Sequence, residues 1–384
     1  MQKLSVKNFG PIGAANVSFG DLTILVGAQA SGKSLFLQLM KLLLDKTYIL
    51  NTLERYNYVI NKNPDNILTN FFGEGLADVW KENTTITTEQ KSYKKNSLLG
   101  LSGTKEESLF YIPAQRILSI ADGRPKNFME FDVSTPYVLR AFSETLRLFF
   151  QNGLGKGRVL FPIKNRLKGS LRNSFDQSIF HGGQVSIDER SGQKKMRMEI
   201  DGMNIPFMTW SAGQKEFMPL LMAFYCLSGP PSQIVKKENF KYIVLEEPEM
   251  GLHPQAIKAI ILQVLELIQS GYKVIISTHS SVFLEFAWAF NLLKNNSKKN
   301  RMKALLEIFE LENGGGAITN NLKGIFDKTV HTFYFARKDN KVHSLDISSL
   351  SAYDENIDVA EWGGLSQFAG KTSEVVAKYV SADE

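Results

Sequence analysis

Eight residues that begin at Gly27 constrain this chain more than any other feature of its sequence. They match the pattern G-x-x-x-x-G-K-S and lie between the apolar runs 22–26 and 35–40. The apolar runs predict a strand before the pattern and a helix after it, and in that setting backbone N–H groups and the helix N-terminus face a chain of phosphates. The sequence therefore predicts a nucleoside triphosphate site made of Gly27, Ala28, Gln29, Ala30, Ser31, Gly32, Lys33 and Ser34.

Two side chains of this loop are expected to contact the nucleotide and its metal. Lys33 is placed to reach the β and γ phosphates, and the hydroxyl of Ser34 to bind Mg²⁺. ATP and Mg²⁺ are therefore the expected cofactors. The net charge of +6 is a mild bias towards anionic partners, and binding of ATP alone is enough to account for it.

Length and composition describe an ordinary globular protein. The 384 residues, 43% of them apolar, predict either a few domains or one nucleotide-binding domain with large insertions. No run of eighteen apolar residues and no signal-peptide pattern is present, so we expect a cytoplasmic protein without a membrane partner. The one cysteine, Cys226, excludes an internal disulfide.

The hydrophobic periodicity changes several times along the chain. Residues 2–26 are predicted as a β-meander and residues 49–105, which are polar and rich in Asn and Lys, as an inserted lobe of helices and loops. Residues 120–200 are predicted as a mostly helical, basic insertion that leads into antiparallel strands over 185–207.

The second half of the chain predicts a further α/β block. Residues 242–280 are predicted as a strand, a helix and a second strand parallel to the first. Residues 331–347 are predicted as a hairpin and residues 349–384 as a C-terminal tail. We therefore expect the whole chain, 1–384, to form a single domain.

A run of acids follows the predicted strand 242–245. In sheets of this kind ligands bind at the carboxyl ends of the strands. Glu246 is therefore expected to hold Mg²⁺, and Glu247 to orient or deprotonate the attacking water. A solvated acidic turn is the alternative interpretation of this run.

Two further strand ends carry polar side chains. His279 follows the next predicted strand, 32 residues after Glu247, and is expected to face the γ-phosphate. Gln115 follows the strand 109–112 and is expected to contact both Mg²⁺ and the attacking water, although its neighbour Arg116 is an equal candidate.

A fifth motif precedes a long apolar helix. Ser211 and Gln214 have the spacing of a capping box, which by itself explains a helix start. The same residues match the signature motif L-S-G-G-Q, and a capped helix start with a glycine is also an anion site. The predicted signature consists of Ser211, Ala212, Gly213 and Gln214.

With these motifs in this order, the chain resembles the ABC-class ATPases of the SMC/RecF/OLD branch. Residues 111–116 and 245–254 are most similar to OLD-like ATPases. The resemblance implies an α/β fold, an ABC-type P-loop ATPase head with a mixed sheet and helices, to which an antiparallel β portion and the inserted helical lobe are added. It also implies that two heads sandwich ATP, so that residues 211–214 act in trans in a homodimer or higher oligomer.

Three positions depart from the usual motifs of these ATPases. Glu246 stands where an aspartate is usual, Ala212 replaces a signature glycine, and residues 28–30 differ from the more usual loop. None of these changes removes a phosphate, metal or water ligand, so we expect hydrolysis of ATP to ADP and phosphate.

A basic stretch between residues 145 and 175 is a candidate surface for DNA or RNA, because it contains no acid and four interleaved phenylalanines. The alternative is a solvated basic face over core phenylalanines. The basic residues are Arg147, Lys156, Arg158, Lys164, Arg166, Lys168 and Arg172.

Full OLD-type proteins carry a Toprim nuclease domain. The residues after His279 contain neither a D-x-D pair nor a glutamate after a buried strand, so we expect an OLD-like head without that nuclease. By analogy, the first hypothesis is a regulatory ATPase that controls a separate effector, such as a nuclease or toxin, in bacterial antiviral defence. A RecF-like DNA-repair clamp and a nucleotide-locked scaffold with little hydrolysis are the alternatives.

Overall fold

Ten strands form one mixed sheet that runs through the molecule. The computed structural model describes residues 1–60, 63–100, 105–153, 158–189, 192–231, 235–311, 320 and 322–380. This sheet and its helices confirm the expected α/β class. Its strands, from one edge to the other, are β5 (Ser92–Tyr93), β4 (Trp80–Thr88), β1 (Lys3–Phe9), β2 (Ile12–Ser18), β16 (Lys341–Asp346), β15 (Val330–Lys338), β3 (Leu22–Val26), β14 (Lys273–Ser277), β13 (Tyr242–Glu246) and β6 (Leu109–Ile112).

Four parallel strands at one end of this sheet carry the nucleotide motifs. β3 pairs with β14, β14 with β13, and β13 with β6, all in parallel. Ser277 stands opposite both Leu25 and Glu246, so these strands end at nearly the same level. The residues that follow each strand therefore meet at one edge of the sheet, which is where ligands bind in such folds.

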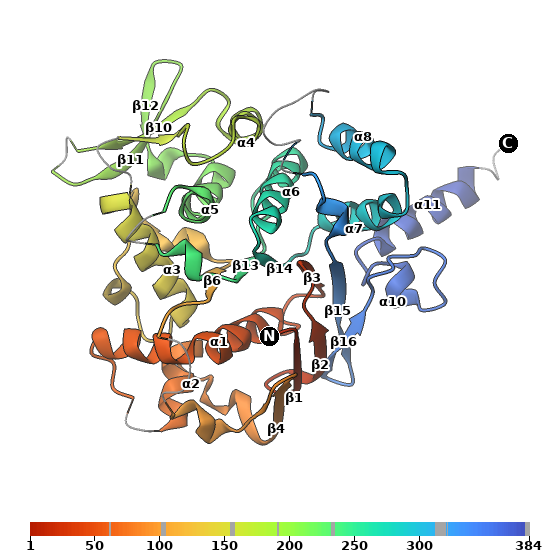
Figure 1. Cartoon of the computed structure of the whole chain (residues 1–384), viewed down its shortest axis with the longest axis horizontal. Helices are drawn as coiled ribbons and strands as arrows, with labels where there is room; N and C mark the ends of the chain where they lie inside the picture. The colour runs from red at the N-terminus through yellow and green to blue at the C-terminus, as the bar shows by residue number, and fades with distance from the viewer. Residues whose placement is uncertain are drawn as a thin grey trace.

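Helices cover both faces of these central strands, and Figure 1 shows α1 (Lys33–Arg55) and α6 (Pro254–Gln269) on opposite sides of them. Ile243 and Leu245 of β13 pack in one core cluster with α5 and α6. Val244 packs in a second cluster with α1. Alternate side chains point to opposite faces of a strand, which explains why its run of apolar residues is unbroken. The covering helices are α1 (Lys33–Arg55), α2 (Pro64–Phe72), α5 (Ala212–Ser228), α6 (Pro254–Gln269) and α7 (Ser281–Lys294).

The expectation of a β-meander over residues 2–26 is wrong for its last strand. β1 and β2 form an antiparallel hairpin closed between Phe9 and Ile12. β3 instead pairs in parallel with β15 and β14. The hairpin of β15 and β16, which confirms the prediction for residues 331–347, lies between β2 and β3. Local turn signals cannot show that a segment 300 residues away enters a sheet.

The segment 49–105 is not made of helices and loops alone. α1 continues to Arg55 and α2 follows, as the polar pattern allowed. β4 then pairs with β1 and extends the main sheet, so the expectation is wrong for this strand. Trp80 and Ile86 are the buried side chains of β4, and its threonines favour extended backbone.

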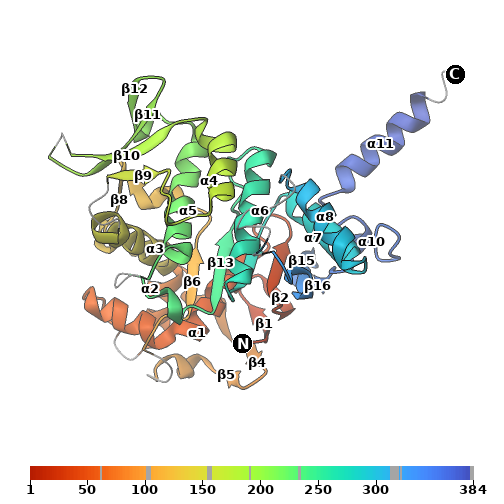
Figure 2. The ribbon, with the colours of Figure 1, turned by 45° about the horizontal axis from the view of Figure 1, so that its top comes forward.

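A smaller antiparallel sheet lies beside the α5 face of the molecule (Figure 2). It confirms the antiparallel strands predicted for residues 185–207 and adds one strand that the sequence analysis did not predict, β9 (Val159–Phe161). The other strands are β10 (Gln184–Asp188), β11 (Lys195–Ile200) and β12 (Met203–Pro206). Two helices, α3 (Tyr137–Leu148) and α4 (Gly169–Phe175), and the short pair β7 (Ile120–Ala121) and β8 (Arg124–Pro125) complete this region.

The C-terminal segment is of two kinds. Leu350 and Val359 are buried, and Trp362 donates a hydrogen bond through Nε1 to Leu350 O at 3.0 Å, so the part that contains α10 (Ile357–Ala360) belongs to the body. α11 (Gln367–Val380) extends away from the body in both ribbon views (Figures 1 and 2). α8 (Lys298–Ile308) packs beside α7. Every helix among the described residues is too short or too polar to cross a bilayer.

Candidate ATP site

The loop from Gly27 to Ser34 has the backbone that its glycines predict. Gly27 has φ 151°, and a Cβ atom there would lie 2.8 Å from Phe335 O of the neighbouring strand. Gly32 has φ 78° and caps the N-terminus of α1. Both positions favour glycine because other residues rarely adopt positive φ. Ala30 also has a positive φ, 56°, so this loop is strained at one non-glycine position.

Lys33 folds back over this loop. Its Nζ donates to Gly27 O at 2.8 Å, to Ala28 O at 3.0 Å and to Ser31 Oγ at 3.2 Å. Burial lowers the pKa of Lys33 to about 8, and the negative charges of Glu247, Glu246 and Glu249 oppose this shift. The ammonium thus lies at the mouth of the loop, where a bound polyphosphate would replace its weak backbone partners by full negative charges.

Glu246 ends β13 and is 3% exposed. Burial raises the pKa of Glu246, and the neighbouring Ser34 and Tyr111 hydroxyls offset part of that rise. Oε1 of Glu246 has no hydrogen-bond partner among the described residues. A buried carboxylate oxygen beside Ser34 fits Mg²⁺, which takes one or two protein oxygens and otherwise binds water and phosphate. The described residues contain no group of three or more His, Cys, Asp or Glu arranged for a metal.

Glu247 and His279 lie side by side although they come from different strands. Nε2 of His279 is 3.5 Å from Oε1 of Glu247, and both side chains are about 30% exposed (31% and 29%). The hydrogen bond with His279 lowers the pKa of Glu247, and burial works in the opposite direction. Glu247 has φ 43°, and its N–H donates to Ser277 O at 2.8 Å. The structure therefore brings the two predicted catalytic residues together and keeps the carboxylate ionised.

Glu249 was not among the predicted site residues, although it belongs to the same acidic run. Its Oε1 accepts hydrogen bonds from the Thr278 hydroxyl and from the N–H of His279, both at 2.7 Å. This carboxylate therefore fixes the backbone that presents the His279 ring. The spacing E-x-E after a buried strand was the signal available in the sequence.

Of the two neighbours Gln115 and Arg116, only Arg116 is buried against the acidic loop of the site. Arg116 is completely buried and donates to the carbonyl oxygens of Glu246, Glu247 and Pro248 at 3.2 to 3.4 Å. Its Nε also donates to Glu216 O of α5 at 3.1 Å. Arg116 thus joins the acidic loop to the signature helix. The side chain of Gln115 is exposed, so its proposed contacts to Mg²⁺ and water remain a prediction.

The signature residues form the capped start of α5. Ser211 Oγ accepts from Gln214 N at 3.3 Å, and Gln214 Oε1 accepts from Ser211 N at 3.2 Å, which is the predicted capping box. A Cβ atom on Gly213 would lie 2.8 Å from Gly251 O, so only glycine allows this approach to the loop after Glu249. Ser211 and Ala212 are exposed. No hydrogen bond between described residues joins 211–214 to the phosphate loop of the same chain.

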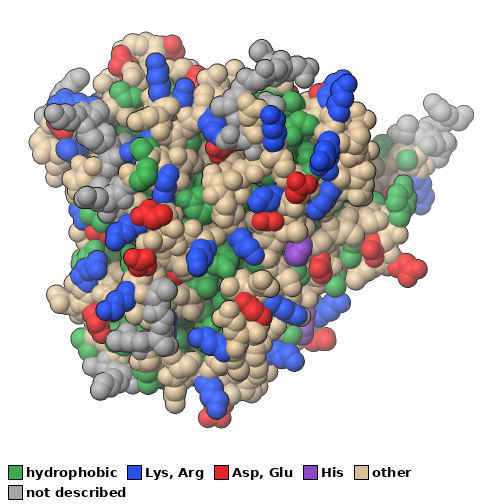
Figure 3. Space-filling model, viewed as in Figure 1, with side chains coloured by type: hydrophobic (Ala, Val, Ile, Leu, Met, Phe, Trp, Pro, Cys, Tyr) green, Lys and Arg blue, Asp and Glu red, His purple; other side chains and the backbone are tan. Residues whose placement is uncertain are grey.

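The basic stretch is largely tied to the protein itself. Arg147 pairs with Glu144 at 2.7 Å, Arg158 with Glu189 at 3.0 Å, and Lys168 with Glu266. Lys156 lies outside the described residues. The four interleaved phenylalanines, at positions 149, 150, 161 and 175, are buried. On the face in Figure 3, lysines and arginines are dispersed among acids and uncharged side chains. The geometry favours the core interpretation of the phenylalanines, while nucleic-acid binding remains a prediction.

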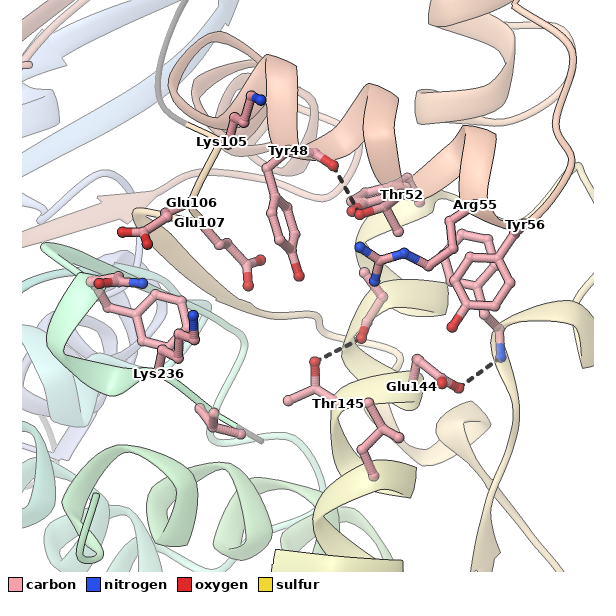
Figure 4. A pocket seen from close by; sticks show the side chains of 17 residues that line it. Tyr48, Thr52, Arg55, Tyr56, Lys105, Glu106, Glu107, Glu144, Thr145 and Lys236 are labelled. Atoms are coloured by element: carbon pink, nitrogen blue, oxygen red, sulfur yellow. Dashed lines mark hydrogen bonds between the residues drawn. The ribbon is translucent and has the colours of Figure 1, made fainter. Parts of the chain in front are cut away.

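A separate hollow of about 270 Å³ lies at the far end of α1 (Figure 4). Tyr48 and Arg55 of α1 point into it, and Glu107 lies across from Tyr48. The negative charge of Glu107 raises the pKa of Tyr48 to about 12. None of the predicted ATP residues lines this hollow, so it is separate from the predicted nucleotide site.

Replacing Lys33 with Ala should weaken ATP binding, because it removes a charge-assisted contact to the phosphates worth about 1.5–3 kcal/mol. Equilibrium binding of a fluorescent ATP analogue would measure the loss, with circular dichroism to confirm the fold. Lys46 is a lysine of the same helix outside the site, so Lys46→Ala is the control. A folded Lys33→Ala protein with unchanged affinity would disprove the loop assignment.

Two family models match adjoining parts of the chain. Residues 122–285 match a model described as an AAA domain, putative AbiEii toxin, Type IV TA system, and residues 1–117 match an AAA ATPase domain. The Old nuclease of Escherichia phage P2 is 41% identical over 66 residues. That match spans 16% of this chain and only 11% of the phage protein.

Solved structures with low identity are also similar. An SMC head bound to the C-winged helix domain of ScpA has 12% identity and a TM-score of 0.43, with 90% of this chain and 96% of that chain covered. The SMC head domain from Thermotoga maritima has 12% identity and a TM-score of 0.36, with 90% and 98% covered. A dimeric ATP-binding cassette bound to ADP and Pi has 12% identity and a TM-score of 0.32, with 72% and 88% covered.

The order of the motifs along the sheet, the two ATPase family models on either side of residue 120 and the segment shared with an OLD protein agree with one another. This chain accordingly has the sequence motifs of an ABC-class ATPase and is similar to ATPase domains of the OLD-like kind.

Proposed function

We propose that this ATPase hydrolyses ATP with Mg²⁺ in a composite site between two copies of the chain, and that the cycle controls a separate effector in bacterial antiviral defence. The main support for hydrolysis is the 3.5 Å contact between Glu247 and His279. Both residues follow strands that end at the same edge of the sheet as the strand before the Lys33 loop. Ser34 and Glu246 would hold Mg²⁺, which neutralises charge on the phosphates when bound.

Glu247 is the general base of this proposal. Its lowered pKa leaves the carboxylate ionised near neutral pH, so it can accept a proton from water as the water oxygen bonds to the γ-phosphorus. The bond between the γ-phosphorus and the β–γ bridging oxygen breaks, and the electron pair leaves with ADP. His279 and Glu249 orient the base, and Lys33 stabilises charge on the β and γ oxygens.

The composite site rests on the position of the signature. Residues 211 and 212 are exposed at the start of a capped helix, and they have no hydrogen bond to the phosphate loop of their own chain among the described residues. A helix start with free N–H groups is an anion site. A second copy can therefore present its nucleotide to this helix, as the ABC class implies.

Mixing two inactive variants tests this arrangement. Ser211→Arg should inactivate the signature, and Lys33→Ala the phosphate loop, so each homogeneous protein should hydrolyse ATP slowly. In a mixture, one composite site of each hetero-pair keeps an intact loop and an intact signature, and up to about half of the activity per pair should return. The control is a mixture of Ser211→Arg with the double variant, which cannot restore a site. No recovery despite demonstrated hetero-assembly would argue against the sandwich.

The defence role is supported by the comparisons, and one exposed helix is a candidate docking site for the effector. One matching family is described as a putative AbiEii toxin of a Type IV TA system, and the shared segment comes from a phage Old nuclease. α11 carries an apolar stripe that lies in solvent, with Phe368 84%, Val376 53% and Tyr379 64% exposed. Exposed apolar stripes of this kind mark protein interaction sites, so we assign effector docking to α11.

Charge on this stripe should uncouple the effector from the ATPase. Phe368→Asp with Tyr379→Asp should abolish co-purification of a nuclease or toxin from the native host, while ATP turnover persists. Ser373→Asp is the matched control, because the helical period places it away from the stripe.

The purified chain alone should cut neither DNA nor RNA with Mg²⁺. Strong nuclease activity of the isolated chain would contradict the separate effector, and ATP-dependent DNA gripping without one would favour the RecF-like alternative.

A further inference from the structure

A second polar hollow lies away from the ATP motifs, where the segment before α4 meets the end of α5 and the middle of α6. Figures 1 and 2 show α4 beside α6 on this side of the molecule. The hollow has a volume of about 300 Å³. Its lining includes four basic side chains, Lys164, Arg166, Lys168 and Arg172, and one carboxylate, Glu266.

Charge accumulates in this small space. Four cations and one anion leave an excess of three positive charges, and the ion pair of Lys168 with Glu266 accounts for the single carboxylate. The other two members of the predicted basic stretch that the structure describes, Arg147 and Arg158, do not line the hollow. The basic stretch is therefore a concave cluster of four residues with two separate, ion-paired arginines, and not a continuous band.

The two arginines are held in place by backbone carbonyls. Arg172 donates through Nη1 to Lys164 O at 2.9 Å and to Leu167 O at 2.7 Å. Both of these hydrogen bonds use Nη1, so the N–H donors on Nη2 and Nε of the Arg172 guanidinium remain for a ligand. Arg166 lies over the Phe149 ring at 4.8 Å and donates to Tyr225 O at 3.3 Å. Side chains ordered in this way lose little further freedom when they bind an anion.

Gln263 of α6 provides a second, independent observation. Its side chain is completely buried, its Nε2 donates to Ser228 Oγ at 3.1 Å, and its Oε1 has no hydrogen-bond partner among the described residues. The two ends of an amide have nearly the same shape. With the amide reversed, Oε1 accepts from the Ser228 hydroxyl, and Nε2 becomes a buried donor without a partner on a residue that lines the hollow. A ligand with acceptor oxygens would then satisfy it.

We infer that this hollow binds a terminal phosphate, as a phosphomonoester or a short polyphosphate. Arg and Lys donors with one amide donor suit phosphate oxygens, and a space of about 300 Å³ admits one or two phosphates but no duplex. A terminal phosphate carries close to two negative charges, which matches the excess of positive charge better than one backbone diester. The site goes beyond ATP hydrolysis, and its phosphate comes either from a nucleic-acid end or from a small polyphosphate.

Binding of three probes tests this site. A 3′-labelled single-stranded hexanucleotide with a 5′-phosphate, the same oligonucleotide with a 5′-hydroxyl, and pyrophosphate are titrated into the full chain that carries Lys33→Ala, which removes the competing phosphate loop. Fluorescence anisotropy follows the oligonucleotides and calorimetry follows pyrophosphate. Preference for the 5′-phosphate form of at least tenfold supports a nucleic-acid end. Saturable pyrophosphate binding without that preference supports a small polyphosphate. No saturable binding of any probe overturns the inference.

Variants distinguish a built site from general attraction. Lys164→Gln removes an exposed cation and should weaken binding about tenfold. Lys298→Gln makes the same change of charge outside the hollow and should change binding less than twofold. Gly169→Glu places a carboxylate next to Arg172, because its Cβ atom would lie 3.7 Å from Nη2, and should abolish binding without disturbing the fold. The inference would be overturned if Lys164→Gln and Lys298→Gln weaken probe binding equally. It would also be overturned if the Gly169→Glu protein binds the probe with unchanged affinity.

Discussion

Glu247→Gln should lower the rate of ATP hydrolysis by about 10²- to 10⁴-fold, because an amide cannot accept the proton of the attacking water. ATP affinity should stay within a few fold of the wild type, since Lys33 and the phosphate loop remain intact. Single-turnover hydrolysis measured beside equilibrium ATP binding separates the two effects. The assembled pair should also live longer with ATP bound, because hydrolysis is what opens it in the proposed cycle.

Glu246→Gln, the same change at the preceding residue, shows which of the two carboxylates is the general base. Glu246 is buried beside Ser34, so its loss should weaken the response to Mg²⁺ in addition to lowering turnover. Glu247→Gln should leave the Mg²⁺ concentration needed for half-maximal ATP binding unchanged. If Glu246→Gln alone abolishes turnover and Glu247→Gln is nearly normal, the base is Glu246 and the assignment is wrong by one residue.

Arg116→Ala should lower the free energy of unfolding by about 3–5 kcal/mol. This is the range observed when one partner of a buried charged interaction is removed and the other stays buried. The change leaves the carbonyl oxygens of Glu246, Glu247 and Pro248 buried without their donor. Urea denaturation followed by circular dichroism would measure the loss of free energy of unfolding.

Two companion variants separate stability from catalysis. Arg116→Lys keeps the charge but cannot donate to four carbonyls at once, so it should fold and still hydrolyse ATP more slowly than the wild type. Gln115→Ala changes an exposed side chain and should alter stability by less than about 0.5 kcal/mol. A stable Arg116→Ala protein with normal turnover would show that Arg116 holds neither the loop nor the base.

The parts of the site that depend on a short run of consecutive residues could be predicted from the sequence. The strand before Gly27, the helix after it and the strand–helix–strand unit of residues 242–280 each combine a buried run with a motif at its end. The proximity of Glu247 and His279 then followed from parallel pairing of consecutive strands. These inferences needed no knowledge of distant contacts.

What could not be predicted depends on distant contacts or on side-chain direction. β4 joins β1 across seventy residues, and the C-terminal hairpin separates β2 from β3. Whether Gln115 or Arg116 turns inward is decided by the short helix Arg116–Ser119, which buries Arg116 and leaves Gln115 exposed at its N-cap. The basic stretch contains no acid, so its partners had to come from elsewhere, and Glu266 lies about a hundred residues away.

The contact between Gly213 and Gly251 has a consequence for the two sites of a pair. Gly213 belongs to the helix start proposed to meet the nucleotide of another copy, and Gly251 belongs to the loop that follows the chain's own acidic run. Arg116 joins the same two elements through Glu216 O and Glu247 O. In the proposed pair, a movement of either element on nucleotide binding would change the free energy of ligand binding at the other site, and thermodynamic linkage would make the effect equal in both directions. Binding of ATP should accordingly be cooperative, with a Hill coefficient that falls towards one when residue 116 no longer joins the two elements.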